Sequence, residues 1–342
     1  MRAAFPFILF GLLIFLSACA DRGLGGDLMD KKHCFRKYTK RVVNKDAELK
    51  GCTSPLLRIV KRYPEKYQYK YPVFNPSNKN EIAYVRSTFN EDLKKMGQPE
   101  LWTFNFCTGK TKRLASVIAN EPDWSAKDWL IYRGGGSKLF KVKSNGDSLT
   151  TLPKIKGTKL TPGWNDKGDL FAIRVKKKDQ KPKILIATEN GLSVGVFDDF
   201  ILKNWDWVGK QMTYVDAGDG KQEIKMFNFE SRTSHVIETI ENYSATDSLF
   251  LNTIYFKEKE LVFWNQLKQI CYTDIKSRKR KIIKRGAGNR RYHQISLSSD
   301  GKTIVANRLD IKKVGECVME ERWNLVLIDV ETGVERKVKL PK

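Results

Sequence analysis

The sequence has little histidine and little acidic charge, and it has only one long apolar run. Among 342 residues there are three histidines, His33, His235 and His293. So few histidines argue against histidine-based catalysis and against a His-rich metal centre. Gly191-Leu192-Ser193-Val194-Gly195 matches Gly-x-Ser-x-Gly, but it begins at an expected Asn190-Gly191 hairpin turn. The nucleophile elbow of α/β-hydrolases instead lies between a strand and a helix, so we expect no such elbow here. We therefore expect no metal and no cofactor, and we assign no catalytic residue. The single apolar run excludes a protein with several membrane spans.

That apolar run reads as an export signal. After Arg2, residues 3–18 are uncharged and end in small side chains, as in a secretory signal peptide. The run is too short for a transmembrane helix, which needs about 20 apolar residues. Leu16-Ser17-Ala18-Cys19 resembles the lipobox of bacterial lipoproteins. The resemblance implies that Cys19 carries acyl chains, such as palmitate, that hold the mature chain on a membrane. It also implies, because Ala20 and not Asp follows, the outer membrane of a bacterial cell envelope.

Five further cysteines are expected in an oxidising compartment, where disulfides persist. Cys34 and Cys52 flank seventeen residues of weak periodicity, and a bridge between them would staple this arm. A Cys107–Cys317 pair is the competing possibility. His33, Cys34 and Cys52 are too few for a structural zinc site, which needs four ligands at a characteristic spacing.

From Tyr71 onward the chain repeats one pattern six times. Each unit has an aromatic or aliphatic anchor, then a polar turn, then a short apolar strand about seven residues later. The anchors are predicted at Phe74, Trp124, Trp164, Trp205, Ile254 and Leu297, at spacings of 50, 40, 41, 49 and 43 residues. This is the period of a propeller blade.

The second half of each unit has the pattern of a β-hairpin. Alternating apolar runs end at Thr108-Gly109, Asn145-Gly146, Asn190-Gly191 and Thr332-Gly333, and such dipeptides accept the positive φ of tight turns. A fourth, more polar strand follows each turn. The predicted fold class is therefore all-β, a six-bladed β-propeller of four-stranded blades.

The repeats resemble the six-bladed propellers of the TolB type. The likeness covers residues 71–340 and is strongest in Tyr71–Tyr84 and Leu297–Ala306, where a Ser-Ser-Asp-Gly-Lys turn leads into the strand. It implies three parts: a lipoprotein signal peptide (1–18), a lipidated tether with a short N-terminal arm (19–70) and the propeller (71–342). A seven-bladed ring that uses residues 45–70, or a β-sandwich, is the alternative.

Two long segments predict where a partner binds. Residues 85–100 and 307–322 join the second and third strands of the first and last units. These units become neighbours when the ring closes, and loops on a rigid scaffold commonly carry binding residues. The candidate contacts are Phe89, Lys94, Lys95, Met96, Arg308, Lys312, Lys313 and Trp323. The alternative is that these segments are plain solvated insertions.

Positive charge predicts a second kind of contact. Lys and Arg total 63 against 39 Asp and Glu, a formal net charge of +24, and such a field attracts phosphates, uronic acids and anionic lipid headgroups. The candidate anion-binding residues are Lys176, Lys177, Lys178, Arg278, Lys279, Arg280, Arg290 and Arg291. No aromatic residues alternate with these lysines, and the chain is exported, so no nucleic acid is expected. Alternatively, basic outer strands protect sheet edges from pairing.

The function predicted from these features is a binding or scaffolding module on the cell envelope, held by its acyl chains, with a protein or an anionic envelope polymer as partner. The alternative is a propeller-type lyase or hydrolase acting on acidic polysaccharide. That enzyme would use channel-facing Lys and Arg residues together with His293. A cluster of perturbed titratable groups in the channel mouth would favour the enzyme, and a patch on a loop face would favour the scaffold.

Overall fold

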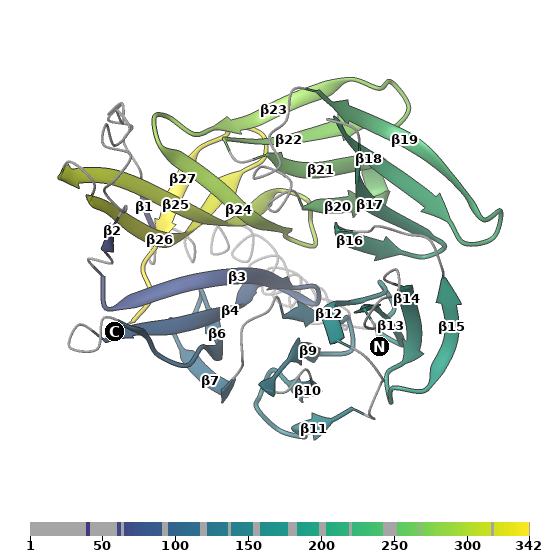
Figure 1. Ribbon diagram of the computed structural model, residues 1–342, viewed down its shortest axis with the longest axis horizontal. Coiled ribbons are helices and arrows are strands. Elements are labelled where there is room, and N and C mark those ends of the chain that lie inside the picture. The colour runs from purple at the N-terminus through teal and green to yellow at the C-terminus, as the bar shows by residue number, and fades with distance from the viewer. Residues whose placement is uncertain are drawn as a thin grey trace, which may run out of the picture.

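The structure is a computed structural model. It describes residues 39–41, 60–62, 65–90, 95–116, 122–135, 138–152, 158–176, 183–197, 203–218, 221–241, 252–266, 268–315 and 318–341. Over these ranges the strands form six sheets arranged around a centre (Figure 1), and the four strands of each blade are antiparallel. The predicted all-β, six-bladed propeller is confirmed. Within the same ranges no helix has the length and apolarity to span a bilayer.

The first three blades follow the chain in order. Blade 1 contains β3 (Tyr67–Asn75), β4 (Asn78–Asn90), β6 (Glu100–Asn105) and β7 (Thr111–Ser116), with the short β5 (Lys95–Met96) paired to β4. Blade 2 contains β8 (Asp123–Trp124), β9 (Trp129–Arg133), β10 (Leu139–Lys143) and β11 (Thr150–Thr151). Blade 3 contains β12 (Thr158–Trp164), β13 (Leu170–Lys176), β14 (Lys183–Thr188) and β15 (Ser193–Phe197).

The last three blades repeat this order. Blade 4 contains β16 (Lys203–Val208), β17 (Gln211–Gly218), β18 (Lys221–Asn228) and β19 (Thr233–Ile240). Blade 5 contains β20 (Thr253–Phe256), the 3-10 helix η3 (Lys257–Lys259), β21 (Leu261–Gln266), β22 (Gln269–Asp274) and β23 (Arg280–Arg285). Blade 6 contains β24 (Arg290–Leu297), β25 (Thr303–Gly315), β26 (Val318–Asp329) and β27 (Glu335–Val338).

The hairpin turns between the third and fourth strands form where the sequence predicted them. Gly109, Gly146, Gly191 and Gly333 have φ values of 70, 79, 83 and 65°, which only glycine adopts without strain. In blades 4 and 5 the corresponding turns contain Arg232 and Arg278, with φ values of 56 and 57°. Arg232 and Arg278 therefore carry backbone strain that glycine avoids at the corresponding position of the other four blades.

The anchors occupy the innermost strands, with two corrections. Phe74, Trp124 and Trp164 are buried as predicted. In blade 4 the buried residue at this register is Trp207, which pairs with Met212, and Trp205 is only partly buried. In blade 5 it is Tyr255, paired with Val262, and not Ile254. The predicted anchors were displaced because these two blades lack the Ser-Pro-Asp-Gly-like turn that fixes the register elsewhere.

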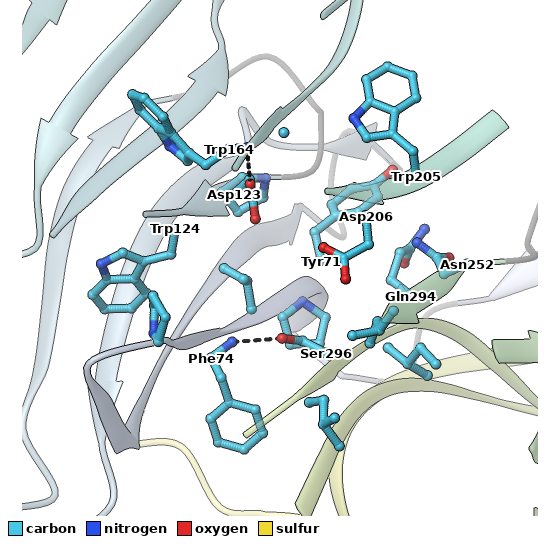
Figure 2. A pocket seen from close by; sticks show the side chains of 18 of the residues that line it. Tyr71, Phe74, Asp123, Trp124, Trp164, Trp205, Asp206, Asn252, Gln294 and Ser296 are labelled. Atoms are coloured by element: carbon cyan, nitrogen blue, oxygen red, sulfur yellow. Dashed lines mark hydrogen bonds between the residues drawn. The ribbon is translucent and has the colours of Figure 1, made fainter. Parts of the chain in front are cut away.

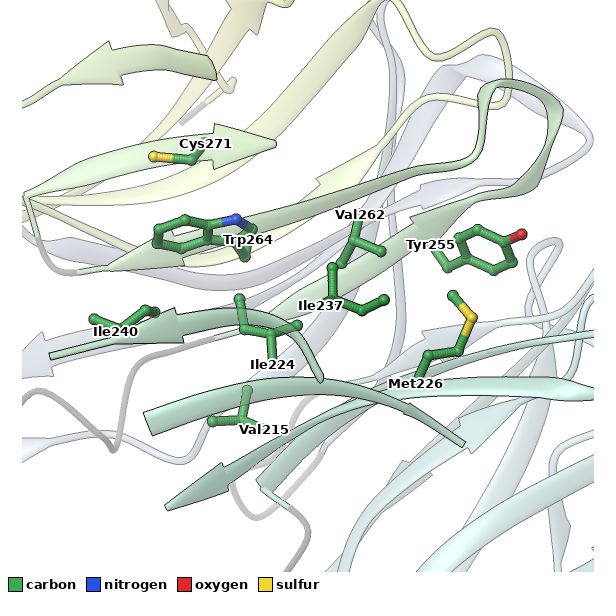
Figure 3. Packing of buried hydrophobic residues seen from close by; sticks show 9 residues of the cluster. All are labelled: Val215, Ile224, Met226, Ile237, Ile240, Tyr255, Val262, Trp264 and Cys271. Carbon is green, nitrogen blue, oxygen red and sulfur yellow. The ribbon is translucent and has the colours of Figure 1, made fainter. Parts of the chain in front are cut away.

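Apolar side chains of neighbouring blades fill the space between the sheets. The cluster between blades 4 and 5 is typical: Val215, Ile224, Met226, Ile237 and Ile240 of blade 4 meet Tyr255, Val262, Trp264 and Cys271 of blade 5 (Figure 3). Each blade presents apolar residues to both neighbours, so no blade can bury its faces alone. The ring is therefore the folding unit, as in other repeat architectures.

Each blade of the ring has four strands that follow one another in the chain, and the sheet of the last blade also takes up strands from the N-terminal end. Strands β24–β27 of blade 6 all come from the end of the chain, and β3, β4, β6 and β7 of blade 1 follow each other directly. The N-terminal arm instead adds β1 (Thr39–Arg41) antiparallel to the outer strand β27 and β2 (Val60–Arg62) parallel to β26. Packing also closes the ring: Phe74, Ile82 and Tyr84 share a core with Val305, Leu325 and Leu327.

Candidate functional site

A cavity of about 260 Å³ lies at the centre of the ring, lined by the innermost strands of all six blades (Figure 2). One residue from each blade stands directly before its anchor and lines the cavity: Val73, Asp123, Gly163, Asp206, Ile254 and Ser296. Blades 2, 4 and 6 contribute hydrogen-bonding side chains, whereas blades 1, 3 and 5 contribute an apolar residue or glycine. The ring therefore alternates around its axis.

In blades 2, 4 and 6, the polar residue that precedes the anchor accepts a hydrogen bond from the backbone of the next blade. The Asp123 carboxylate accepts a hydrogen bond from the backbone N–H of Trp164 at 2.5 Å. The Asp206 carboxylate accepts one from the N–H of Tyr255 at 2.7 Å, and the Ser296 hydroxyl accepts one from the N–H of Phe74 at 3.0 Å. Figure 2 shows the bonds made by Asp123 and Ser296. The third bond joins the last blade to the first, so the same device helps to close the ring.

The environment of the two carboxylates disfavours their charge. Burial raises the pKa of Asp123 to about 7, against the smaller opposing effect of the Trp164 N–H. Burial likewise raises the pKa of Asp206 to about 6, with the Tyr255 and Trp207 N–H groups acting against it and Asp166 adding to it.

Among the described residues that line the cavity, none is a lysine, arginine or histidine. The contrast with a net charge of +24 is sharp. The polysaccharide-cleaving alternative required channel-facing Lys and Arg and His293, and that placement is wrong. His293 lies instead in β24 at the seam with blade 1, buried, with its ring 4.9 Å from that of Trp323. Burial lowers its pKa to about 3, with Arg291 and Lys70 adding to the effect, so it is neutral at physiological pH.

The two long segments predicted as binding loops are extensions of strands. β4 continues to Asn90 and pairs with β5, so that Phe89 lies opposite Met96. β25 and β26 pair as far as Gly315 and Val318. Both extended hairpins flank β3 and lie on the same side of the ring (Figure 1). We call their exposed residues Met96, Lys312, Val314 and Arg322 the hairpin surface.

Aromatic and cationic side chains pack against each other at the base of the two hairpins. The Lys70 ammonium lies 4.5 Å from the Trp323 ring centre, and the Arg86 guanidinium lies 3.7 Å from that of Trp102. The Trp323 N–H donates to the Gln68 side chain at 3.3 Å. Trp323 is only half-buried. Such contacts stiffen the base of the hairpins, so blades 1 and 6 present one continuous platform.

Arg308 is not a surface contact, and this prediction is corrected. It lies in β25 with 5% of its surface exposed. Its guanidinium pairs with Glu335 and with Asp310, the latter at 2.5 Å. The Tyr292 hydroxyl donates to Glu335 at 2.6 Å. Arg308 lies well before the end of β25 at Gly315, and its charge is neutralised by Asp310 and Glu335.

The other predicted contacts of the hairpin region lie as follows. Phe89 and Lys313 are half-buried, and Lys312 is exposed. Lys95 belongs to β5. Lys94 lies outside the described residues.

The candidate anion-binding residues do not form one surface: the first part of the basic run lies on the outer strand of blade 5, whereas Arg290 and Arg291 begin β24, the innermost strand of blade 6. Lys279 and Arg280 are exposed at the start of β23. Arg278 donates to the carbonyl of Val236 in blade 4 at 2.5 Å, and Arg290 pairs with Asp310 at 3.3 Å. Arg291 is half-buried and Lys176 is exposed at the end of β13. Lys177 and Lys178 lie outside the described residues.

The cysteine predictions fall largely outside the described residues, which exclude Cys19, Cys34, Cys52 and Cys317. Cys107 is disulfide-bonded. Cys271 is free and buried, and burial raises the pKa of its thiol to about 12, so it is an unreactive part of the core.

Sequence reasoning missed the channel carboxylates. A usable pattern was present: Asp123-Trp124 and Asp206-Trp207 both place an acid directly before a buried tryptophan of an innermost strand. It also missed an apolar stripe on the outer strand of blade 3, where Leu192, Val194 and Val196 are 54 to 66% exposed. β15 has no charged residue to mark it as an edge strand.

Comparison with solved structures places the fold among β-propellers. A TolB protein from Agrobacterium tumefaciens superposes with a TM-score of 0.55 at 17% identity, covering 70% of this chain and 88% of that one. The acylaminoacyl peptidase of Pyrococcus horikoshii gives a TM-score of 0.54 at 11% identity, and the chain matches about half (52%) of that enzyme. A nidogen/laminin complex gives 0.51 at 11% identity, covering 79% of this chain and 91% of that one.

At these identities the likeness shows the fold and nothing finer. No protein-family model matches the sequence, and no curated protein matches it either.

Proposed function

We propose that this chain is a lipid-anchored binding module of a bacterial cell envelope, which recognises a protein partner through the hairpin surface of blades 1 and 6. The observation that carries the proposal is the pairing of two extended hairpins on adjacent blades, with Met96 and Val314 exposed by 38 and 39%. Exposed apolar residues beside cations are typical of interface cores and rims. The nidogen/laminin complex gives an example of such a propeller in a complex with a protein, which supports this proposal.

The anchor and the location rest on the sequence. Leu16-Ser17-Ala18-Cys19 supports acylation at Cys19, and several acyl chains would hold the protein on a bilayer almost permanently. Replacing Cys19 with Ser should move the protein from the membrane fraction to the soluble fraction and abolish incorporation of labelled palmitate. Recovery of an unlabelled, soluble wild-type protein would contradict the anchor.

The partner proposal is tested by charge insertion with a matched control. In cells, a photo-crosslinker at position 96 or 314 should yield a discrete adduct, and a single charge at the other of these two positions, Val314→Glu or Met96→Glu, should reduce that adduct at least tenfold. Val194→Glu places the same charge on the apolar stripe of β15 and should leave the adduct unchanged. Equal loss in both variants, or adducts only at β15, would overturn the assignment.

Mutations on the basic edge of blade 5 test whether the partner is a protein or an anionic polymer. Binding to a polymer would depend on Lys279 and Arg280 and would fall steeply with salt. An adduct that survives Lys279→Ala/Arg280→Ala and persists at high salt supports a protein partner, and loss in both conditions points to the polymer instead.

A further inference from the structure

The central cavity is chemically unlike the rest of the molecule. It is lined by two carboxylates, by aromatic rings that include Tyr71 and Trp205, and by the amides Asn252 and Gln294 (Figure 2). Asp123 and Asp206 are both partly accessible, and their accessible surface faces this space. None of the lining residues described carries a positive charge, although Lys and Arg make up 63 of 342 residues. The two acids therefore have no cationic partner in the cavity wall.

A further observation indicates that the cavity is shaped for a ligand. Thr253 lines it with 4% of its surface exposed, and its hydroxyl has no hydrogen-bond partner within the described part of the chain. Buried polar groups are normally paired, so the presence of this hydroxyl in the wall is explained if a polar group enters.

Two of the strands that line the cavity contain β-bulges. Register shifts interrupt β3 between Lys70 and Val73 and β24 between His293 and Ile295. At these bulges Tyr71 and Gln294 have φ values of 54 and 27°, and both residues line the cavity. Bulges commonly re-aim side chains near functional sites, and strain of this kind is kept where it serves one.

We propose that the channel binds an organic cation, an ammonium or guanidinium group, between Asp123 and Asp206, with the aromatic rings of Tyr71 and Trp205 packed against its apolar part. Carboxylates supply charge-assisted hydrogen bonds, and aromatic faces attract cations. The group comes either from a free amine or from a lysine or arginine side chain of a peptide. This site is separate from the hairpin surface and does not depend on the proposed function.

Binding should be linked to protonation. The titratable residues that line the cavity are Tyr71, Asp123 and Asp206, and Asp166 acts on Asp206 from the neighbouring turn. The pKa values of about 7 for Asp123 and about 6 for Asp206 mean that a cation competes with protons there. Affinity should therefore rise as the pH increases from 5 to 8.

The test is calorimetric titration of the full-length protein with spermidine and with the blocked tripeptide Ala-Lys-Ala. At least one probe should bind at pH 8 and weaken at pH 5. Asp123→Asn/Asp206→Asn should weaken that binding roughly tenfold or more, since a charged hydrogen bond is lost at each site. The control Glu258→Gln/Glu331→Gln removes the same net charge from exposed positions and should change nothing. Thermal melts verify that both variants fold.

The arms separate the two sources of the cation. Binding of spermidine alone assigns the site to free amines, and binding of the tripeptide assigns it to a protein side chain. The proposal is overturned if neither probe binds, if Ala-norleucine-Ala binds as well as Ala-Lys-Ala, or if the two double variants weaken binding equally. None of these results bears on the crosslinking at positions 96 and 314, so the two proposals fail separately.

Discussion

At the scale of single residues, buried charge dominates the behaviour of this protein. Asp123 and Asp206 are held in the channel wall by backbone N–H donors, whereas Glu335 is held by Arg308 and Tyr292. The first pair lacks a cation and keeps a raised pKa. The second group has its counter-charge built in. A buried carboxylate is therefore a source of pH sensitivity at one site and of rigidity at another.

The channel acids should make the protein less stable as the pH rises. The pKa of Asp123 is about 7 in the folded chain and near 3.8 when unfolded, so the folded state binds more protons between these values. The free energy of unfolding should therefore decrease from about pH 4 to pH 7. Asp123→Asn should remove part of this decrease and should be more stable than wild type at pH 8 in urea melts.

Asp169 provides the opposite control. Its pKa is lowered, chiefly by a hydrogen bond from Asn165, so its charged form stabilises the fold. Asp169→Asn should lose stability at pH 7 and little at pH 3. If the two variants show the same pH dependence, the assignment of the raised pKa to Asp123 is wrong.

The Arg308 network should tolerate no one-sided change. Glu335 is 3% exposed and Arg308 is 5% exposed. Glu335→Ala leaves the guanidinium with only Asp310, and removing one partner of a buried pair typically costs about 3–5 kcal/mol. Chemical denaturation measures this loss. Glu331→Ala, at an exposed position of the preceding turn, should remain within about 0.5 kcal/mol of wild type.

At the scale of elements, the hairpin turns decide how much strain each blade carries. Four turns place glycine at positive φ, whereas blades 4 and 5 place Arg232 and Arg278 there. Arg278 is compensated by its hydrogen bond to the Val236 carbonyl. Arg232 is exposed, and its side chain offers the fold no burial in return for the strain.

Arg232→Gly should therefore stabilise the protein, by up to about 1 kcal/mol, because a left-handed conformation costs a side-chain-bearing residue about 1–2 kcal/mol and glycine returns part of this as entropy in the unfolded chain. Gly191→Ala, at φ 83°, should destabilise by a similar amount. Thermal melts of the two variants should shift in opposite directions, and a shift in the same direction would contradict the role assigned to φ.

At the scale of the whole molecule, the ring has one seam, where the first and the last complete blades meet. Blades 1 and 6 are joined by a shared apolar core, by the Phe74 to Ser296 hydrogen bond and by the Asn307 amide, which donates to the Tyr69 carbonyl at 2.6 Å. At the other junctions the chain passes directly from one complete blade to the next, whereas here only the N-terminal strands β1 and β2, which pair with blade 6, precede β3 of blade 1. The proposed partner surface straddles this seam, so binding there should also stabilise the closed ring.

A core truncation at the seam should open it selectively. Leu325→Ala removes a side chain that is 1% exposed from the core shared by blades 1 and 6, and Leu130→Ala is the match between blades 1 and 2. Each should cost about 2–5 kcal/mol. Only Leu325→Ala should accelerate hydrogen exchange in β3 and β24 ahead of the rest, and similar exchange patterns in both variants would show that the seam is not the weak point.

The sequence alone determined the fold class, because propeller blades are local. A hairpin of alternating apolar residues closed by Asn145-Gly146 or Thr332-Gly333 carries its own register, and six repeats at nearly equal spacing define a ring. The anchors of blades 4 and 5 were misplaced where Trp205 and Trp207, or Ile254 and Tyr255, offered two registers. Local sequence does not choose between them, since packing against the next blade does.

Only the tertiary structure decided which residues face the channel and which charges are neutralised. Asp123 accepts a hydrogen bond from Trp164 of the next blade, and Ser296 accepts one from Phe74, which lies in the adjacent blade but 222 residues away in the sequence. Arginine is typical of surface contacts, yet Arg308 is buried and pairs with Glu335. Strand pattern fixes which side of its own sheet a residue takes, whereas its environment depends on blades 40 or more residues away. For this reason the candidate partner surface could be predicted from the length of the segments 85–100 and 307–322. The channel carboxylates could be recognised only in the closed ring.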